Sequence, residues 1–114
     1  MPTLRILTSA QILPQDRPAL LARASGVAAE MLGKPESYVL VILEDGRDLL
    51  FGGDPAPAAY LELKSLGLPE AKAADYSRTL CNLLAETLNI PAERVYIEFS
   101  APPAHLFGWN GRTF

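Results

Sequence analysis

The sequence predicts an α+β domain in which two βαβ units form one four-stranded mixed sheet with two helices on one face. The first observation is an internal repeat. Residues 32–41 and 88–97 superimpose without a gap, each with a helix-end leucine, a proline three positions later and a β-rich run. The second is that apolar residues recur at intervals of three and four in the segment before each repeat, which is typical of amphipathic helices. Because βαβ crossovers are right-handed, both helices should cover the same face of the sheet.

The first unit is expected to begin with a strand at Pro2–Thr8. A helix should follow, with Asp16 as its N-cap, Pro18 in its first turn and Gly33 at its end. Its apolar stripe is Leu20, Leu21, Ala24, Val27, Ala28, Met31 and Leu32. The next strand, Ser37–Glu44, is apolar over most of its length, so we expect it to be covered on both faces.

The second unit is expected to contain a strand at Ala58–Leu66, a helix over about Glu70–Leu88 and a strand at Arg94–Ser100. Two such units leave one sheet face bare, and an apolar bare face predicts that further copies of the chain cover it. The short piece Leu49–Phe51 and the aromatic tail, residues 106–114, are candidates for pairing across subunits. The alternative is a tail that folds back over its own sheet.

Composition excludes several classes of protein. With 114 residues, 49% of them hydrophobic, the chain is expected to form one domain over residues 1–114. The net charge of -3 and the absence of a basic cluster argue against nucleic-acid and membrane partners. Apolar runs are short and no secretory signal is apparent, so we expect a cytoplasmic protein. The single cysteine, Cys81, and the lone His105 do not suffice for a metal site, and no cofactor is expected.

The start of the chain carries a candidate catalytic group. Pro2 is small enough to permit removal of Met1, which would leave proline with a free secondary amine. An α-amino group has a pKa of about 7.7–8.0, so a modest shift would suit it to general base catalysis near neutral pH. We therefore treat Pro2 as the candidate base.

A series of short motifs runs through the chain in a fixed order. They are Met1-Pro2, Gly33-Lys34-Pro35, Phe51-Gly52-Gly53, Ser65-Leu66-Gly67, Tyr76-Ser77, Leu80-Cys81, Arg94-Val95-Tyr96-Ile97, Gly108-Trp109-Asn110 and Thr113-Phe114. Together they resemble the macrophage migration inhibitory factor family of the tautomerase superfamily. The resemblance implies a homotrimer whose N-terminal proline catalyses keto–enol tautomerisation of small aromatic keto acids such as phenylpyruvate, or of dopachrome derivatives.

The resemblance also implies roles for individual residues. Pro2 would lie at the base of a pocket between subunits, and Lys34 would hold the substrate carboxylate. Leu66 matches an aliphatic wall residue, with Ser65 beside it. Burial of Pro2 and the charge of Lys34 would both disfavour the protonated amine and lower its pKa.

Further pocket residues show both agreement with the family and departures from it. Tyr96 matches a tyrosine supplied by a neighbouring subunit, and Trp109 and Phe114 match aromatic residues at the pocket rim. Glu98 replaces an asparagine, and its carboxylate would favour protonated Pro2 and repel an anionic substrate. Phe107 replaces a smaller aliphatic residue and would narrow the pocket. We therefore expect a tautomerase that is weak on the usual keto acids.

Other activities are weighed against this one. Ala58-Ala59-Tyr60-Leu61 occupies the place of a Cys-x-x-Cys motif, so oxidoreductase activity is not expected. Decarboxylation or hydrolytic dehalogenation at the same proline typically needs further arginines, and Arg5 should point to the other face of its strand. The remaining alternative is a cytokine-like binding or signalling protein with a protein receptor and a residual pocket. Members of the family can leave cells without a signal peptide, so export stays open.

Overall fold

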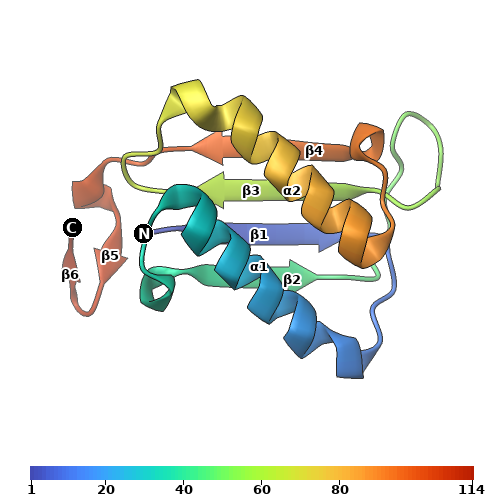
Figure 1. The fold of residues 1–114 in the computed structure, drawn as a ribbon, viewed down its shortest axis with the longest axis horizontal. Coiled ribbons are helices and arrows are strands. Elements are labelled where there is room, and N and C mark those ends of the chain that lie inside the picture. The colour runs from blue at the N-terminus through green and yellow to red at the C-terminus, as the bar shows by residue number, and fades with distance from the viewer.

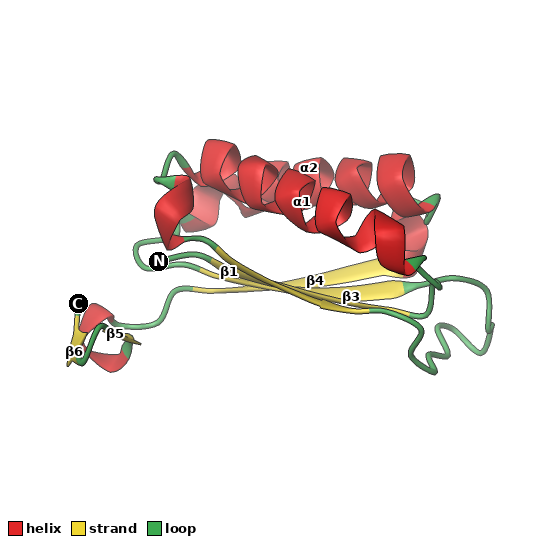
Figure 2. Ribbon diagram, turned by 90° about the horizontal axis from the view of Figure 1, so that it is seen from below, coloured by secondary structure: helices red, strands yellow, loops and turns green.

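Four strands form the central sheet of the structure, a computed structural model that describes residues 1–114. They are β1 (Thr3–Thr8), β2 (Leu40–Glu44), β3 (Ala59–Lys64) and β4 (Val95–Ser100), in the order β2-β1-β3-β4. The β1–β2 and β3–β4 pairs are parallel, and β1 and β3 are antiparallel. Two βαβ units therefore meet at the centre of a mixed sheet with both helices on one face (Figures 1 and 2), which confirms the predicted fold class.

Both helices begin in a short 3-10 turn. Helix α1 (Arg17–Leu32) follows the turn Pro14–Asp16, and α2 (Ala73–Leu88) follows the turn Glu70–Lys72, so α2 starts three residues later than predicted. Asp16 stands at the N-cap position of α1, but its side chain makes no capping hydrogen bond. Neither helix is long and apolar enough to cross a membrane.

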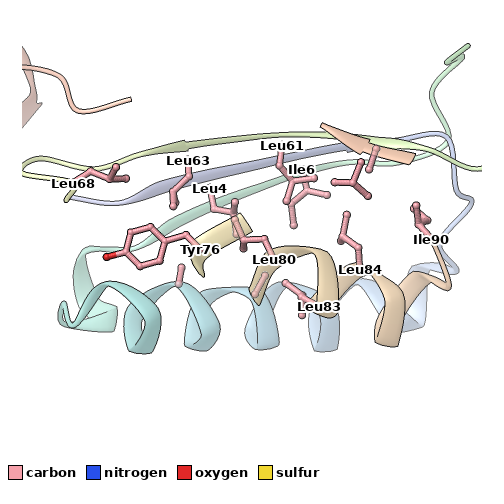
Figure 3. Close-up of a cluster of buried hydrophobic side chains, with 14 residues drawn as sticks. Leu4, Ile6, Leu61, Leu63, Leu68, Tyr76, Leu80, Leu83, Leu84 and Ile90 are labelled. Atoms are coloured by element: carbon pink, nitrogen blue, oxygen red, sulfur yellow. The ribbon is translucent and has the colours of Figure 1, made fainter. Parts of the chain in front are cut away.

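The core lies between the helices and one face of the sheet (Figure 3). Alternate residues of β1 and β3 point toward the helices, as the period of a strand requires. The large side chains buried completely in this layer are Leu4, Ile6, Leu61, Leu63, Leu80, Leu84 and Ile90. Helix α1 contributes Ala24 and Ala28, which are also fully buried. The apolar stripes predicted from spacing therefore point inward.

The other sheet face is open in the single chain, and β2 lies at its edge. Leu40 and Ile42 of β2 are 55% and 38% exposed, so the expectation of a strand covered on both faces is wrong for one chain. The strand is also shorter than predicted, because Glu36–Tyr38 forms a 3-10 turn. Pro35, with its φ of -60°, precedes this turn, and the amide of Tyr38 donates to the Pro35 carbonyl at 3.1 Å.

Charged and polar side chains occupy the middle of the open face. Arg5 donates to Glu44 at 2.5 Å and to Glu62 at 2.8 Å, and the Tyr60 hydroxyl donates to Glu98 at 3.0 Å. The hydrogen bond from Arg5 lowers the pKa of Glu44, so this carboxylate stays ionised. Arg5 thus points away from the helices, as predicted, and its charge is already paired.

In the single chain, the two segments predicted to pair across subunits form local structure of their own. Leu49–Phe51 is not a strand, because the chain turns at Gly52 and Phe51 forms only an isolated bridge with Asp54. The tail forms a C-terminal hairpin of β5 (Gly108–Trp109) and β6 (Arg112–Thr113). The hairpin lies beyond the end of the sheet at which the chain begins (Figure 1) and does not fold back over the open face.

Candidate active site

The start of the chain is held at one end of the sheet. Pro2 is completely buried, and its carbonyl accepts a hydrogen bond from the Leu40 amide at 3.0 Å. Because β1 lies between β2 and β3, the start of the chain is flanked by two neighbouring strands. Met1 is only partly buried, so its removal would leave the more enclosed Pro2 with the free amine.

Lys34 reaches this terminus from the end of α1. Gly33 ends the helix with a φ of +63°, a conformation that glycine adopts without steric cost, and the chain then turns back toward the sheet. The Lys34 ammonium donates to the Leu66 carbonyl at 2.6 Å and lies within hydrogen-bonding reach of the terminal amine. Three effects lower the pKa of the Met1 amine from its ordinary value of 8.0. The largest is burial, followed by the positive charge of Lys34 and then by hydrogen bonding to the Lys34 side chain.

Ser65 and Leu66 lie beside the terminus. In the β1–β3 register Thr3 faces Lys64, so the next position along each strand brings Pro2 opposite Ser65. Ser65 is fully buried, and its hydroxyl has no hydrogen-bond partner in the chain. The site therefore holds an unused buried hydroxyl close to the candidate base.

A cleft of about 300 Å³ opens between the terminus, the start of β2 and the C-terminal hairpin. It is lined by Met1, Pro2, Thr3, Ser37, Tyr38, Val39, Leu40, Phe107, Gly108, Trp109 and Phe114. The Trp109 ring stacks on Phe114 with centroids 6.0 Å apart, Tyr38 meets Trp109 edge-on at 5.7 Å, and Phe107 lies 6.1 Å from Phe114. Aromatic walls of this kind suit a planar ring.

A larger hollow of about 610 Å³ lies elsewhere, between the start of α1 and the end of α2. The ion pair of Arg23 with Glu86 is part of its lining. None of the predicted site residues lines it. We therefore place the candidate site at the smaller cleft, which is lined by the start of the chain near Lys34.

Tyr96 and Glu98 are not brought to Pro2 within one chain. Tyr96 is 67% exposed and packs against Phe51 with centroids 4.7 Å apart. Its partner in β3 is Tyr60, which faces Leu7 near the far end of β1 from Pro2. Glu98 lies on the open face, where it accepts the hydrogen bond from Tyr60. A site that combines these side chains with Pro2 would need a second copy of the chain.

Two further residues in or beside the cleft were not predicted from the sequence as site residues. Tyr38 was placed inside a predicted strand, although the preceding proline was a signal for a turn. Arg112 pairs with Trp109 across the hairpin, and its guanidinium lies over the indole ring at 5.3 Å. The dipeptide Asn110-Gly111 is a strong signal for a two-residue hairpin turn and would have predicted this pairing.

The arrangement has the elements of a proton-transfer site for an anionic substrate. An amine with a lowered pKa is more often unprotonated near neutral pH and can accept a proton from carbon. The Lys34 ammonium has three donors, so it can bind a carboxylate while still bonded to Leu66. The aromatic walls can hold an adjoining ring.

Comparison with known proteins agrees with this geometry. The model of the family "Macrophage migration inhibitory factor (MIF)" matches residues 1–114. The chain belongs to the MIF family. A MIF homologue from Brugia malayi is 43% identical over 97 residues, which cover 84% of each chain. The MIF of Xenopus tropicalis is 36% identical over 119 residues, which cover 100% of this chain and 99% of the relative.

Solved structures of MIF proteins share the whole fold. The homologue from Prochlorococcus marinus superimposes with a TM-score of 0.92 at 39% identity, covering 98% of both chains. The Trichinella spiralis MIF gives 0.89 at 35% identity, covering 98% of this chain and 99% of the other. The MIF family has the fold of the tautomerase superfamily, so the predicted family is confirmed.

Proposed function

We propose that this MIF-family protein is a keto–enol tautomerase in which Pro2 is the general base. The observation that carries the proposal is the complete burial of Pro2 beside Lys34, in surroundings that lower the pKa of the preceding Met1 amine. In the mature chain Pro2 would take a proton from the carbon next to the keto group, and a proton would be returned to the oxygen. The substrate would be a small aromatic keto acid such as phenylpyruvate, with its carboxylate on Lys34.

A trimer is part of this proposal. Within one chain Tyr96 and Glu98 are remote from the cleft, so they could take part only if a neighbouring subunit presents them. The exposed apolar residues of β2 support such an assembly, because a neighbouring chain would bury them. Ser65, Leu66, Phe107, Trp109 and Phe114 would come from the same subunit as Pro2.

The proposal is tested by phenylpyruvate enolisation in wild type, Pro2→Gly and Glu98→Asn, after intact mass has verified removal of Met1. Pro2→Gly should lose most of the activity, because glycine offers a primary amine in a less constrained chain. Glu98→Asn should raise kcat/KM by about fivefold, because removing a nearby negative charge stabilises both the neutral amine and the bound anion. If Pro2→Gly is as active as wild type, the proposed base is wrong.

A second candidate function is cytokine-like signalling, which the names of the relatives favour. Receptor binding should then persist in Pro2→Gly, since the fold and its outer surfaces would be unchanged. Binding of the variant to cells that respond to the wild-type protein would separate the two functions. A protein that binds such cells but never enolises a keto acid would favour signalling over catalysis.

A further inference from the structure

The C-terminal hairpin carries one charged side chain, Arg112, next to the aromatic residues of the cleft. Phe107, Trp109 and Phe114 all line the cleft. Arg112 pairs directly with Trp109, and cross-strand partners project from the same side of a two-stranded ribbon. The position of the guanidinium over the indole ring, 5.3 Å from its centroid, agrees with this placement. Arg112 therefore stands at the outer edge of the aromatic walls.

Arg112 also differs from every other arginine in the chain. The other six form ion pairs: Arg5 with Glu44 and Glu62, Arg17 with Asp45, Arg23 with Glu86, Arg47 with Glu44, Arg78 with Asp75 and Arg94 with Asp54. No side-chain hydrogen bond or ion pair involves Arg112. Its donors remain available, while stacking on Trp109 restricts where the guanidinium can lie.

The two cations lie near different walls of the cleft. Lys34 lies at the inner end beside the chain terminus, and Arg112 lies on the hairpin over Trp109. A ligand that matches this order has a carboxylate, then an enolisable carbon, then a ring, then a second anion. Arg is suited to the outer position because its planar fork binds a carboxylate through two parallel hydrogen bonds.

We propose that Arg112 is a specificity-determining residue that selects aromatic keto acids carrying a second acidic group on the ring. The proposal rests on the proposed function, because it assumes that the keto acid is bound with its first carboxylate toward Lys34. Phenylpyruvate would fill the aromatic part of the cleft and leave Arg112 unused. This would also account for the weak turnover expected with the usual keto acids.

The test compares phenylpyruvate with 4-carboxyphenylpyruvate in wild type, Arg112→Gln, Arg112→Lys and Arg78→Gln. Arg78→Gln is the charge-matched control, since Arg78 is exposed on α2 and bonds only to Asp75. In Arg112→Gln we expect the ratio of kcat/KM for the two substrates to fall by about fivefold through KM, the size of an exposed ion pair. Arg112→Lys should retain part of the preference, and added salt should weaken it in wild type.

Binding without chemistry separates this proposal from the proposed function. Cinnamate and 4-carboxycinnamate cannot enolise in the same way, so their dissociation constants report Arg112 even if no turnover occurs. The same fivefold loss of preference should appear with this pair. Arg112 has no role in selection if wild type favours neither 4-carboxy compound over its parent compound. The same conclusion follows if Arg112→Gln changes kcat/KM or the dissociation constant equally for both members of each pair. If the binding preference holds but Pro2→Gly matches wild type in turnover, only the catalytic proposal fails.

Discussion

At the start of the chain, two groups that can carry a positive charge lie close together. The terminal amine and the Lys34 ammonium lie within hydrogen-bonding reach, and partial burial removes some of the water that would otherwise screen them. The terminal amine is the group that loses its proton near neutral pH, because α-amino groups ordinarily titrate at lower pH than lysine side chains do. A base and an anion-binding group thus arise from one contact.

Replacement of Lys34 by methionine tests this coupling. The charge of Lys34 disfavours the protonated amine, so its removal should raise the pKa of the amine toward the ordinary 8.0. The acid limb of kcat/KM should therefore move to higher pH, with the largest loss of activity near pH 6. A pH–rate profile measures the shift, and Lys72→Met, in the turn before α2, is the matched control. An unchanged acid limb would show that Lys34 does not tune the amine.

At the scale of elements, Arg94 organises the loop between β2 and β3. Its guanidinium donates to the carbonyls of Pro57 at 2.9 Å, Asp54 at 2.8 Å, Ala56 at 2.8 Å and Phe51 at 3.3 Å. It also lies over the Phe51 ring, which packs against Tyr96. One side chain at the start of β4 therefore holds the loop and the support of Tyr96 together.

The Arg94→Lys variant should separate charge from geometry. Lysine keeps the positive charge but cannot serve four carbonyls from a planar fork, so several acceptors would lose their partner. We expect a loss of about 2 kcal/mol in the free energy of unfolding, measured by urea denaturation. Arg78→Lys, at an exposed ion pair, should change stability by less than about 0.5 kcal/mol. Equal effects at the two positions would contradict the organising role of Arg94.

At the scale of the molecule, the two faces of the sheet have different surroundings. One face is covered by α1 and α2 (Figure 2). The other carries the paired charges of Arg5, Glu44 and Glu62 together with exposed apolar residues of β2. An edge strand with free backbone groups and apolar side chains is a site for association. Assembly would therefore use the edges of the sheet.

The oligomeric state of Ile42→Lys tests this expectation. Wild type should sediment with three times the mass of one chain, and a lysine in β2 should shift it toward the monomer because a buried unpaired charge opposes association. Tautomerase activity should fall with the loss of assembly, since Tyr96 would no longer reach a neighbouring cleft. Leu13→Lys, an exposed leucine outside the sheet, is the control. A wild-type monomer in sedimentation would remove the basis for a shared site.

Much of the fold could be predicted because it follows from local patterns. The apolar spacing of α1 and α2 and the alternation in β1 and β3 belong to short segments, and their periods depend on backbone geometry alone. Gly33 could likewise be recognised as a helix end. The candidate base could be proposed because Met1-Pro2 is a chemical feature of the chain start and needs no folding to be seen.

Other features depended on contacts between distant segments. Whether β2 is covered, whether the tail pairs with itself and where Tyr96 lies relative to Pro2 are set by the strand order and by what packs on each face. The lowered pKa of the amine arises from burial and from Lys34, which lies 33 positions away in the chain and comes near only when α1 packs on the sheet. Electrostatic and packing effects depend on distances in space. The sequence could therefore identify the functional groups, whereas the environment of each group is set by the tertiary structure.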